Sequence, residues 1–511
     1  MKNSFNFNQL FILEMANNHQ GDLEHGLKII NTYGELAKKL GVRCAIKFQF
    51  RQLESFIHPD YHTRTDVKHI PRFVGTKLDL EQYKILRDAV LTQGMVTMCT
   101  PFDEESVPKI LELDLDIIKI GSCSAGDWPL LEKVAETGKP LVISTAGLSQ
   151  SQIDRLVSFF QYRRCDFALM HCVAIYPTPP EKLRLSQIEN LRLRYPEVPI
   201  GFSTHEDPNY FDAVRVAVAK GAKLFERHVD IPSPKYKMNA YSSAPEQIEK
   251  WIKAYLETIE SCGGEHRAPA FPEELESLKT LMRGVYSKKP IKKGQEIKRE
   301  DVFFAMPIQE GQLFSGNWHK GMIADNDYGE GTPINEQLAS FYVSKETQIY
   351  QILLQVQGML NQARIRMGKE SSIEISHHYG LEAFREFGAV LIGIINRAYC
   401  KKLVIQLPRQ KHPYHFHKNK EETFQLLYGD LEVEIDGKQY SLQPGDTLLI
   451  EPKKWHKFHT LHGAIFEEIS TTDLPNDSVY EDEKINAQPK SSRKTQIPNW
   501  ESSVKSALLH E

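Results

Sequence analysis

Features that would place this 511-residue chain in a specialised class are missing from its sequence. No stretch approaches the roughly 18 uninterrupted apolar residues that a membrane-spanning helix requires, so no membrane partner is expected. Neither sign of charge dominates, because 63 basic residues stand against 67 acidic ones and leave a formal net charge of −4. That balance gives no reason to expect nucleic acid or an anionic membrane as a binding partner.

Cysteine is scarce, and its spacing offers neither a disulfide framework nor a CxxC pair. The seven cysteines are odd in number and lie mostly within apolar runs, as in Met98-Cys99-Thr100. Reduced core thiols in a cytoplasmic protein are therefore expected. The first residues, MKNSFNFNQLFILEMANN, contain only a short apolar run that Glu14 interrupts. That pattern predicts a first strand rather than a signal peptide.

What the sequence does contain is a change of pattern along its length, and one domain per roughly 150 residues suggests about three domains. In the first 230 residues, short apolar runs alternate with stretches of helical periodicity. Several stretches end at a glycine suited to a helix C-cap, as at Gly41, Gly138 and Gly221. The apolar runs are Phe11–Ala16, Arg43–Phe48, Met95–Cys99, Asp116–Ile120, Leu141–Ser144, Phe167–His171, Pro199–Ser203 and Lys223–His228. Eight strands alternating with helices predict an α/β fold, a (β/α)8 TIM barrel over residues 1–276, although an open doubly wound sheet has the same alternation.

Two further domains are predicted beyond the barrel. Residues 278–340 contain short segments with Lys, Gly and Pro turns, as in GVYSKKPIKKGQEIKREDVFFAMP, which is typical of a small separate domain. A helix-like connector then precedes alternating strands with glycine turns, which predict an all-β barrel or sandwich over residues 345–485. The polar residues 486–511 are expected to form a flexible tail.

Every predicted barrel strand ends in a polar residue, at the edge where barrel enzymes place their active sites. The residues near these ends are Glu14, Lys47, Gln49, Thr100, Lys119, Ser122, Ser144, His171, Tyr176, Ser203, His205 and His228. Two lysines among several hydroxyls suit a small ligand that carries phosphate and carboxylate groups. Two histidines on adjacent strands, with positions left for water and substrate, suit an open divalent-metal site. A hydrogen-bonded core role is the alternative for either histidine alone, and the lysines on strands 2 and 4 argue against it.

Seven segments of the barrel region resemble the N-acetylneuraminate (sialic acid) synthase family in order and spacing. They are FILEMANNHQGD (11–22), AIKFQ (45–49), TPFDEES (100–106), KIGS (119–122), HCVAIYPTPP (171–180), GFSTH (201–205) and ERH (226–228). RGVYSKKPIKKGQE (283–296) resembles the antifreeze-like, or SAF, domain that ends those synthases. The resemblance covers roughly residues 8–335.

The resemblance implies condensation of phosphoenolpyruvate with an N-acylated aldose, which gives a 2-keto-3-deoxy sugar acid and phosphate. Phosphoenolpyruvate would contact Lys47, Thr100, Lys119, Ser122, Ser144 and Ser203, with the two lysines catalytic. His205 and His228 would hold a divalent metal, usually Mn²⁺, and Glu14 would be a general acid or base. Gln49, Tyr176 and Asn239 would line the sugar site. The SAF domain would cap the barrel of a neighbouring subunit, which implies a homodimer.

Four positions depart from the family pattern, and three of them belong to the aldose side. Cys123-Ser124 follow the strand-4 serine where the family has a glutamate, and Asn239 takes an acidic position. Met306 occupies the place of an SAF arginine that reaches a partner's sugar site, and Ala174 replaces an asparagine or serine nearer to phosphoenolpyruvate. Unpaired polar groups on N-acetylmannosamine would cost about 1–3 kcal/mol each, so a kept reaction with an altered aldose is expected. Alignment slippage in variable loops is the alternative.

The C-terminal region resembles the cupin family in both of its motifs. The first motif, HxHxxxxExxxxxxG, matches His415, His417, Glu422 and Gly429, and the second matches Pro444-Gly445-Asp446, Pro452 and His456. Three histidines and a glutamate from adjacent strands suit one divalent ion, whose identity stays open. Glu421 is a rival for the carboxylate ligand, but the six-residue gap to the motif glycine favours Glu422.

The cupin's role admits several hypotheses. HKNKEETFQLLYGDLEVEIDG and FEEISTTDLPNDSVYEDEKI resemble, more loosely, cupin sugar isomerases of the lyxose isomerase kind. Such a role needs a base near C1 and C2 of a sugar, for which His459 and Glu467 are candidates. The leading hypothesis joins a synthase barrel to a cupin that binds, isomerises or monitors a related sugar. The alternatives are a degenerate barrel beside a working cupin isomerase, and a non-catalytic cupin sensor.

Overall fold

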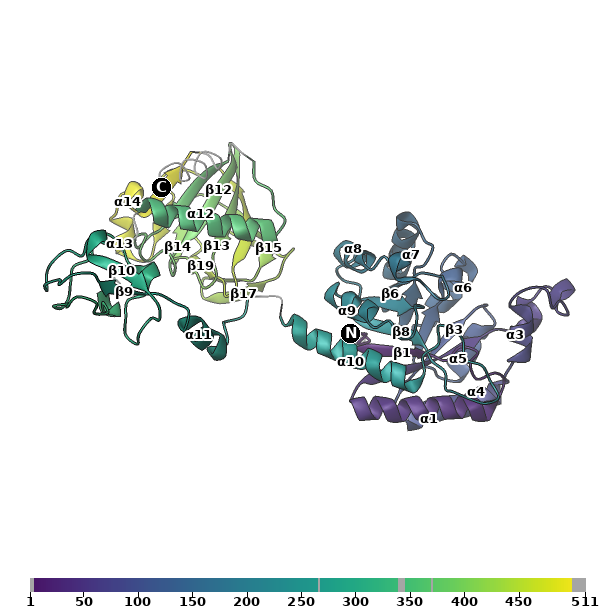
Figure 1. The fold of residues 1–511 in the computed structure, drawn as a ribbon. Helices are drawn as coiled ribbons and strands as arrows, with labels where there is room; N and C mark the ends of the chain where they lie inside the picture. The colour runs from purple at the N-terminus through teal and green to yellow at the C-terminus, as the bar shows by residue number, and fades with distance from the viewer. Residues whose placement is uncertain (1–3, 265–266, 339–344, 369–370, 499–511) are drawn as a thin grey trace. The chain divides into compact units, whose positions relative to one another are not determined.

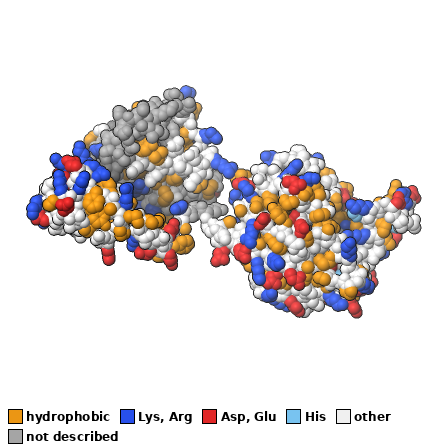
Figure 2. Space-filling view, viewed as in Figure 1, with side chains coloured by type: hydrophobic (Ala, Val, Ile, Leu, Met, Phe, Trp, Pro, Cys, Tyr) orange, Lys and Arg blue, Asp and Glu red, His pale blue; other side chains and the backbone are white. Residues whose placement is uncertain are grey.

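The computed structural model describes residues 4–264, 267–338, 345–368 and 371–498. The chain divides into two units, Met1–Pro269 and Ala270–Glu511, and each is described by itself (Figure 1). None of the described helices is both long and apolar enough to cross a membrane. On the face of the first unit seen in Figure 2, acidic and basic side chains are interspersed, as the near-balanced charge predicts.

The first unit is a closed barrel of eight parallel strands in chain order. The strands are β1 (Leu10–Glu14), β2 (Arg43–Phe50), β3 (Val96–Pro101), β4 (Ile117–Ile120), β5 (Leu141–Ser144), β6 (Phe167–His171), β7 (Ile200–Thr204) and β8 (Leu224–His228). Because β1 pairs with both β2 and β8, the sheet has no edge. The predicted TIM barrel is confirmed, and the open-sheet alternative is wrong.

Helices surround the strands, as Figure 1 shows. The longer ones are α1 (Leu23–Leu40), α4 (Leu80–Thr92), α5 (Ser106–Glu112), α6 (Trp128–Ala135), α7 (Gln150–Tyr162), α8 (Ser186–Arg194), α9 (Asp212–Ala219) and α10 (Pro245–Cys262). Two short helices, α2 (Leu53–Phe56) and α3 (Ile70–Gly75), lie in the connection after β2. Capping boxes at Asp79 and Ser149 fix the starts of α4 and α7, because each side chain accepts a hydrogen bond from a first-turn backbone N–H.

The interior of the barrel is apolar at one end and polar at the other. Leu10, Ile12, Ala45, Ile117, Val142 and Leu224 belong to a buried cluster with Met98, Ala168 and Met170. Strand side chains alternate between faces, so residues 14, 47, 119, 144 and 226 follow these on the same inward face. This alternation places the polar side chains inside the barrel at the carboxyl ends of its strands.

The second unit begins with α11 (Pro272–Lys279) and a small two-stranded element. Its strands β9 (Gly284–Ser287) and β10 (Val302–Ala305) pair in antiparallel fashion. A compact apolar core holds the following segments together and contains Val285, Ile291, Ile297, Val302, Leu313, Met322, Ala324, Tyr328 and Ile334. This element therefore has a core of its own, as the turn-rich sequence predicts.

The rest of the second unit contains two antiparallel sheets preceded by α12 (Lys345–Gln362). One sheet has the order β18-β15-β20-β13-β12-β11-β22 and the other the order β17-β16-β19-β14-β21. Their bounds are β11 (Ser372–Ser376), β12 (Ala389–Asn396), β13 (Tyr399–Gln406), β14 (His415–His417), β15 (Glu422–Gly429), β16 (Leu431–Ile435), β17 (Lys438–Leu442), β18 (Thr447–Ile450), β19 (His456–His459), β20 (Ala464–Thr471), β21 (Ser478–Tyr480) and β22 (Lys494–Ile497). Side chains of both sheets, such as Phe424, Val433, Phe458 and Phe466, share one core. The predicted all-β cupin is confirmed.

The segment after residue 485 corrects a prediction. Its residues up to 497 were expected to be flexible, but they form the short helix α14 (Lys490–Arg493) and the strand β22, after α13 (Glu483–Asn486). β22 pairs with β11, and Ile497 packs against the core that contains Ile373. The polar composition misled because a sheet strand needs only one apolar face. Residues 499–511 lie outside the described residues.

Replacing Ile497 with alanine is expected to lower the free energy of unfolding of the cupin by about 2–4 kcal/mol, because a buried side chain is lost and a cavity remains. Ile497 is only 8% exposed. Urea unfolding of the full chain, followed by circular dichroism, measures the change. The exposed Gln488→Ala variant is the matched control. Equal stability of the two variants would indicate that the segment after residue 485 is flexible, as the sequence predicts.

Candidate functional site

The carboxyl ends of the barrel strands surround a cavity of about 770 Å³. Eleven predicted site residues line it: Glu14, Lys47, Gln49, Thr100, Lys119, Ser122, Ser144, Tyr176, Ser203, His205 and His228. Asn239 does not line it, because its side-chain amide donates a hydrogen bond to Asn18 Oδ1 at 2.8 Å. His171 also lies outside the lining, and its Nε2 contacts the Leu183 carbonyl oxygen at 2.8 Å. The structure thus brings together the residues named from the barrel sequence except Asn239 and His171.

A buried network of two lysines and two glutamates forms the floor of this cavity. Lys47 Nζ is ion-paired with Glu14 and lies 3.0 Å from Glu226 Oε1. Lys119 Nζ lies 3.7 Å from Glu226 Oε2 and donates a hydrogen bond to Ser144 Oγ. Glu226 contacts both lysines and Glu14 contacts Lys47, so the two buried cations have two carboxyl groups as partners.

The ionisation of the two glutamates differs. Burial opposes the charge on Glu226, but Lys119 and Lys47 outweigh it and lower its pKa to about 2. Burial raises the pKa of Glu14, and the nearby Glu226 carboxylate raises it further although Lys47 opposes the change. Glu226 is therefore a permanent anion, whereas Glu14 can hold or release a proton. Two carboxyl groups with diverging pKa values suit an acid–base role for one of them.

Glu226 is the residue that the strand-end argument missed. It lies two positions before His228 on β8 and accepts a hydrogen bond from Ser203 Oγ at 3.0 Å. On the eighth strand only His228 was considered, although the preceding inward position also faces the cavity. The alternation Leu224, Glu226, His228 could have identified it from the sequence.

The geometry around His205 and His228 fits a divalent metal ion. Their ring centroids lie 5.4 Å apart, and His205 Nδ1 contacts the Val173 carbonyl oxygen at 3.1 Å, which leaves its other nitrogen available. Burial lowers the pKa of His205 to about 4 and also lowers the pKa of His228, so both rings stay neutral. Glu14 Oε1 is buried without a hydrogen-bond partner. These unshared donors suit an ion with open positions.

Aromatic and cationic side chains form the upper wall. Tyr176 lies over His205 at 4.3 Å between ring centroids, and Tyr241 lies 5.0 Å from His228. The Arg51 guanidinium lies between the rings of Phe73 and Phe102 and donates to Gln49 Oε1 at 3.0 Å. The same cavity is also lined by Lys68, His69 and Arg72. Cys123 and Ala174, two of the positions that depart from the family pattern, line it as well.

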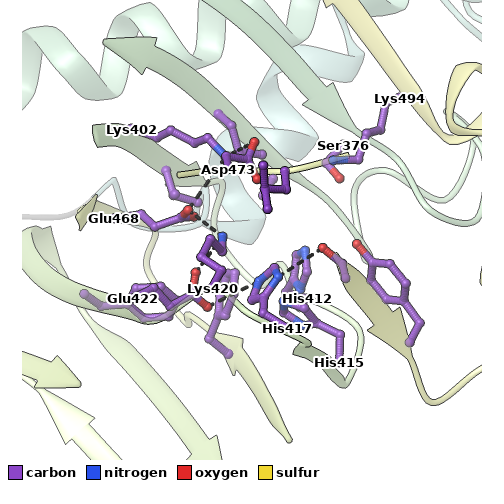
Figure 3. A pocket seen from close by; sticks show the side chains of 18 of the residues that line it. Ser376, Lys402, His412, His415, His417, Lys420, Glu422, Glu468, Asp473 and Lys494 are labelled. Atoms are coloured by element: carbon purple, nitrogen blue, oxygen red, sulfur yellow. Dashed lines mark hydrogen bonds and ion pairs between the residues drawn. The ribbon is translucent and has the colours of Figure 1, made fainter. Parts of the chain in front are cut away.

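The cupin presents a second cluster, of which Figure 3 labels His415, His417 and Glu422. His415 and His417 lie on β14, Glu422 starts β15 and His456 starts β19. Their potential ligand atoms all lie within 4.8 Å of one another, and all four residues are buried. Glu421 is exposed, so the cluster contains Glu422 and not its rival.

These four residues fit a divalent metal ion. The Nδ1 atoms of His415 and His456 each contact a backbone carbonyl oxygen at 3.0 Å, and His417 Nδ1 lies 3.3 Å from Ser478 Oγ. The Nε2 atoms are thereby left for a metal. Glu422 Oε1 and His456 Nε2 face each other at 3.0 Å without the geometry of a hydrogen bond. Burial lowers the pKa of His417 to about 4, so the ring is neutral as a ligand must be.

The cavity above this cluster has a volume of about 80 Å³ and a charged wall. Lys420 Nζ lies 2.8 Å from both Glu422 and Glu468, and Lys402 Nζ lies 2.8 Å from Asp473. The two base candidates from the sequence, His459 and Glu467, do not line this cavity, and Glu467 pairs with Lys401 at 2.8 Å. Its neighbour Glu468 occupies the inward position of β20.

Known protein families match both the barrel region and the cupin region of the chain. Residues 35–267 match the NeuB family and residues 402–466 match the cupin domain. A crystal structure described as spore coat polysaccharide biosynthesis protein E from Chromobacterium violaceum is 41% identical, with a TM-score of 0.61, and covers 64% of this chain and 98% of its own.

Curated relatives have named synthase activities. The N-acetylneuraminate-9-phosphate synthase of Mus musculus is 29% identical over 291 residues, which cover 55% of this chain and 79% of the relative. The N,N'-diacetyllegionaminic acid synthase of Campylobacter jejuni is 26% identical over 338 residues, which cover 64% and 99%. Together with the closed barrel and its lysine-lined cavity, these matches establish that the chain belongs to the NeuB family and carries a cupin domain after its barrel.

Proposed function

We propose that the barrel condenses phosphoenolpyruvate with an aldose and releases a 2-keto-3-deoxy sugar acid and phosphate. The observation that carries this proposal is the buried pair Lys47 on β2 and Lys119 on β4, which both line the cavity beside several hydroxyl side chains. The similarity to sialic and legionaminic acid synthases supports the same reaction class.

Phosphoenolpyruvate is the anion for which this floor is suited. Lys119 and Ser144 would bind its phosphate, while Lys47 would bind its carboxylate near Ser203. Thr100 and Ser122 would complete the hydroxyl set, and Thr100 Oγ1 is buried without a hydrogen-bond partner among the described residues. Glu226 keeps both lysines fixed and charged while the site is empty.

Glu14 is the proposed general acid or base. Burial raises its pKa, which makes it easier for the carboxyl group to take up a proton and pass it to the aldehyde oxygen as carbon C3 of phosphoenolpyruvate bonds to the aldehyde carbon. Water then adds at C2 and phosphate leaves. Held by His205 and His228, a divalent ion, Mn²⁺ in this proposal, would polarise the aldehyde.

The aldose would be an acylated or otherwise modified hexosamine and not necessarily N-acetylmannosamine. Gln49 and Tyr176 line its side of the cavity, as does Cys123. A thiol there replaces a stronger hydrogen-bonding group, so a sugar with fewer polar contacts at this position is favoured. Asn239 is not part of this surface, and its amide instead supports the loop at Asn18.

The small domain after the barrel would be an SAF domain that caps the barrel of a second subunit in a homodimer. Met306 is 59% exposed, so its apolar side chain is available for packing against such a partner. It offers no charge for sugar recognition, in contrast to an arginine at that place.

The cupin would hold a divalent metal and act on or sense a related sugar. The second candidate function is sugar isomerisation by the cupin beside a degenerate barrel, and the observation that favours it is Glu468, an acid next to the metal donors. A non-catalytic sensor has the same donors. Turnover of free sugars by the full chain separates the isomerase from the sensor.

Purified protein with Mn²⁺ and phosphoenolpyruvate is expected to release phosphate with at least one aldose from a panel of N-acylated and plain sugars. Mass spectrometry should then detect a product heavier than that aldose by a pyruvate unit. The His228→Ala variant is expected to lose this activity. Absence of phosphate release with every aldose, in protein shown to hold metal, would favour the cupin as the working centre.

A further inference from the structure

One wall of the cupin cavity comes from the C-terminal segment. Tyr480, Arg493 and Lys494 line the cavity together with His415, His417 and Glu422. Figure 3 shows Lys494 and Ser376 on the side of the cavity away from Lys402 and Glu468, with Asp473 between them and the labelled histidines below. The segment that the sequence predicted to be flexible therefore contributes cations to the site.

Arg493 differs from the other cations of this cavity. Lys402 and Lys420 are ion-paired with carboxylates of the lining, and Lys494 is ion-paired with Glu374. The Arg493 guanidinium lies 5.2 Å from the centroid of the Tyr480 ring. Its Nε and Nη1 atoms are buried and have no hydrogen-bond acceptor among the described residues. Buried N–H groups of a cation without an acceptor are rare in folded proteins and indicate a missing ligand.

The charge of the cavity defines the kind of ligand. Its lining contains four cationic side chains, Lys402, Lys420, Arg493 and Lys494, and three carboxylates, Glu422, Glu468 and Asp473. Glu374 lies outside the lining and pairs with Lys494, so the side-chain charges balance, and a divalent ion at the histidine cluster would leave two positive charges in excess. An uncharged sugar would leave this excess uncompensated, whereas an anionic ligand would balance it.

We infer that the cupin cavity binds the carboxylate end of a 2-oxo acid, with Arg493 as the residue that anchors the carboxylate. A carboxylate with an adjacent oxygen matches both a guanidinium and a metal with open positions. The cavity of about 80 Å³ accommodates this end of the molecule, while a longer chain would extend through its mouth.

Two sources share this chemistry. One is the 2-keto sugar acid made by the barrel, and this part of the inference rests on the proposed synthase function. The other is a small 2-oxo acid such as pyruvate. In the first case the cupin would recognise the product of the same chain, so the sensor hypothesis gains a defined ligand and the free-aldose isomerase loses support.

The test uses the full chain with His205→Ala and His228→Ala, which remove the barrel's metal donors, loaded with Co²⁺. Pyruvate, N-acetylneuraminate and N-acetylmannosamine are titrated separately, and the visible Co²⁺ spectrum and the heat of binding are recorded. We expect either acid to change the spectrum at saturation and the uncharged aldose to leave it unchanged. Tighter binding of N-acetylneuraminate would identify the sugar acid as the ligand, and equal or tighter binding of pyruvate would identify a small acid.

Arg493→Met is expected to weaken binding of the acid about 10- to 100-fold, because a charge-assisted contact is lost. Arg493→Lys keeps the charge but not the two parallel N–H donors of the guanidinium, so its affinity for the acid should lie between those of the unmodified protein and Arg493→Met. The exposed Arg366→Met is the matched control, and unchanged Co²⁺ content verifies the fold of each variant. Equal affinities of Arg493→Met and Arg366→Met, or equal binding of the aldose, would overturn the inference. Since no phosphoenolpyruvate is present, this outcome is independent of the phosphate-release assay.

Discussion

Replacing Lys119 with methionine is expected to lower phosphoenolpyruvate-dependent phosphate release by about 10²- to 10³-fold, the usual loss when one preorganised charge partner is removed. Lys119 is buried, donates to Ser144 and lies 3.7 Å from Glu226. Without it, Glu226 keeps only Lys47 as a cationic partner among the described residues, and the phosphate loses its nearest cation. Methionine has a similar length and is apolar, so the buried volume is nearly preserved.

Steady-state phosphate release measures this effect, with kcat and KM for phosphoenolpyruvate determined separately. Lys133→Met on α6 is the matched control, because Lys133 is exposed and pairs only with Glu136 in its own helix. An unchanged kcat/KM in the Lys119 variant, with normal stability, would exclude Lys119 from the proposed phosphate site.

Glu422→Gln is expected to weaken metal binding by the cupin at least about 100-fold, more than the loss of a residue that only supports a ligand. The substitution keeps the shape of the side chain and removes its charge. Lys420 retains Glu468 as a partner at 2.8 Å, so the fold should survive. The adjacent Glu421→Gln variant is an unusually close control, since Glu421 is exposed and outside the cluster.

Equilibrium dialysis with elemental analysis measures metal content for both variants in the His205→Ala, His228→Ala background. We expect the Glu421 variant to keep one equivalent of divalent metal and the Glu422 variant to lose it under the same conditions. Equal metal content in the two variants would exclude the four-residue cluster as the cupin's metal site.

The barrel and most of its cavity were predictable because strand alternation and polar strand ends are local properties of the sequence. Glu226 could also have been found by extending the alternation one step inward from His228. Asn239 could not be placed, because its position depends on a contact with Asn18 that lies far away in the sequence. Its side chain donates a hydrogen bond to the loop at Asn18 and does not line the cavity.

The cupin errors have a different physical origin. Whether Glu467 or Glu468 faces inward depends on strand register, and a shift of one residue exchanges the two faces. β20 pairs with β15 through a bulge between Leu426 and Tyr428, which sequence periodicity does not reveal. The metal donors, in contrast, are fixed by motif spacing on β14, β15 and β19. Arg493 enters the cavity only through the pairing of β22 with β11, a nonlocal contact.

The pairing of β22 with β11 also determines the order in which the molecule can be completed during synthesis. The barrel closes entirely within the first 230 residues, so it can fold while the rest is still being translated. The cupin sheet can be completed only later, because β11, which begins at residue 372, pairs with β22 only when residue 497 has left the ribosome. A chain whose synthesis ends shortly before residue 493 would therefore have a complete barrel, but its cupin cavity would lack the wall that Arg493 and Lys494 form.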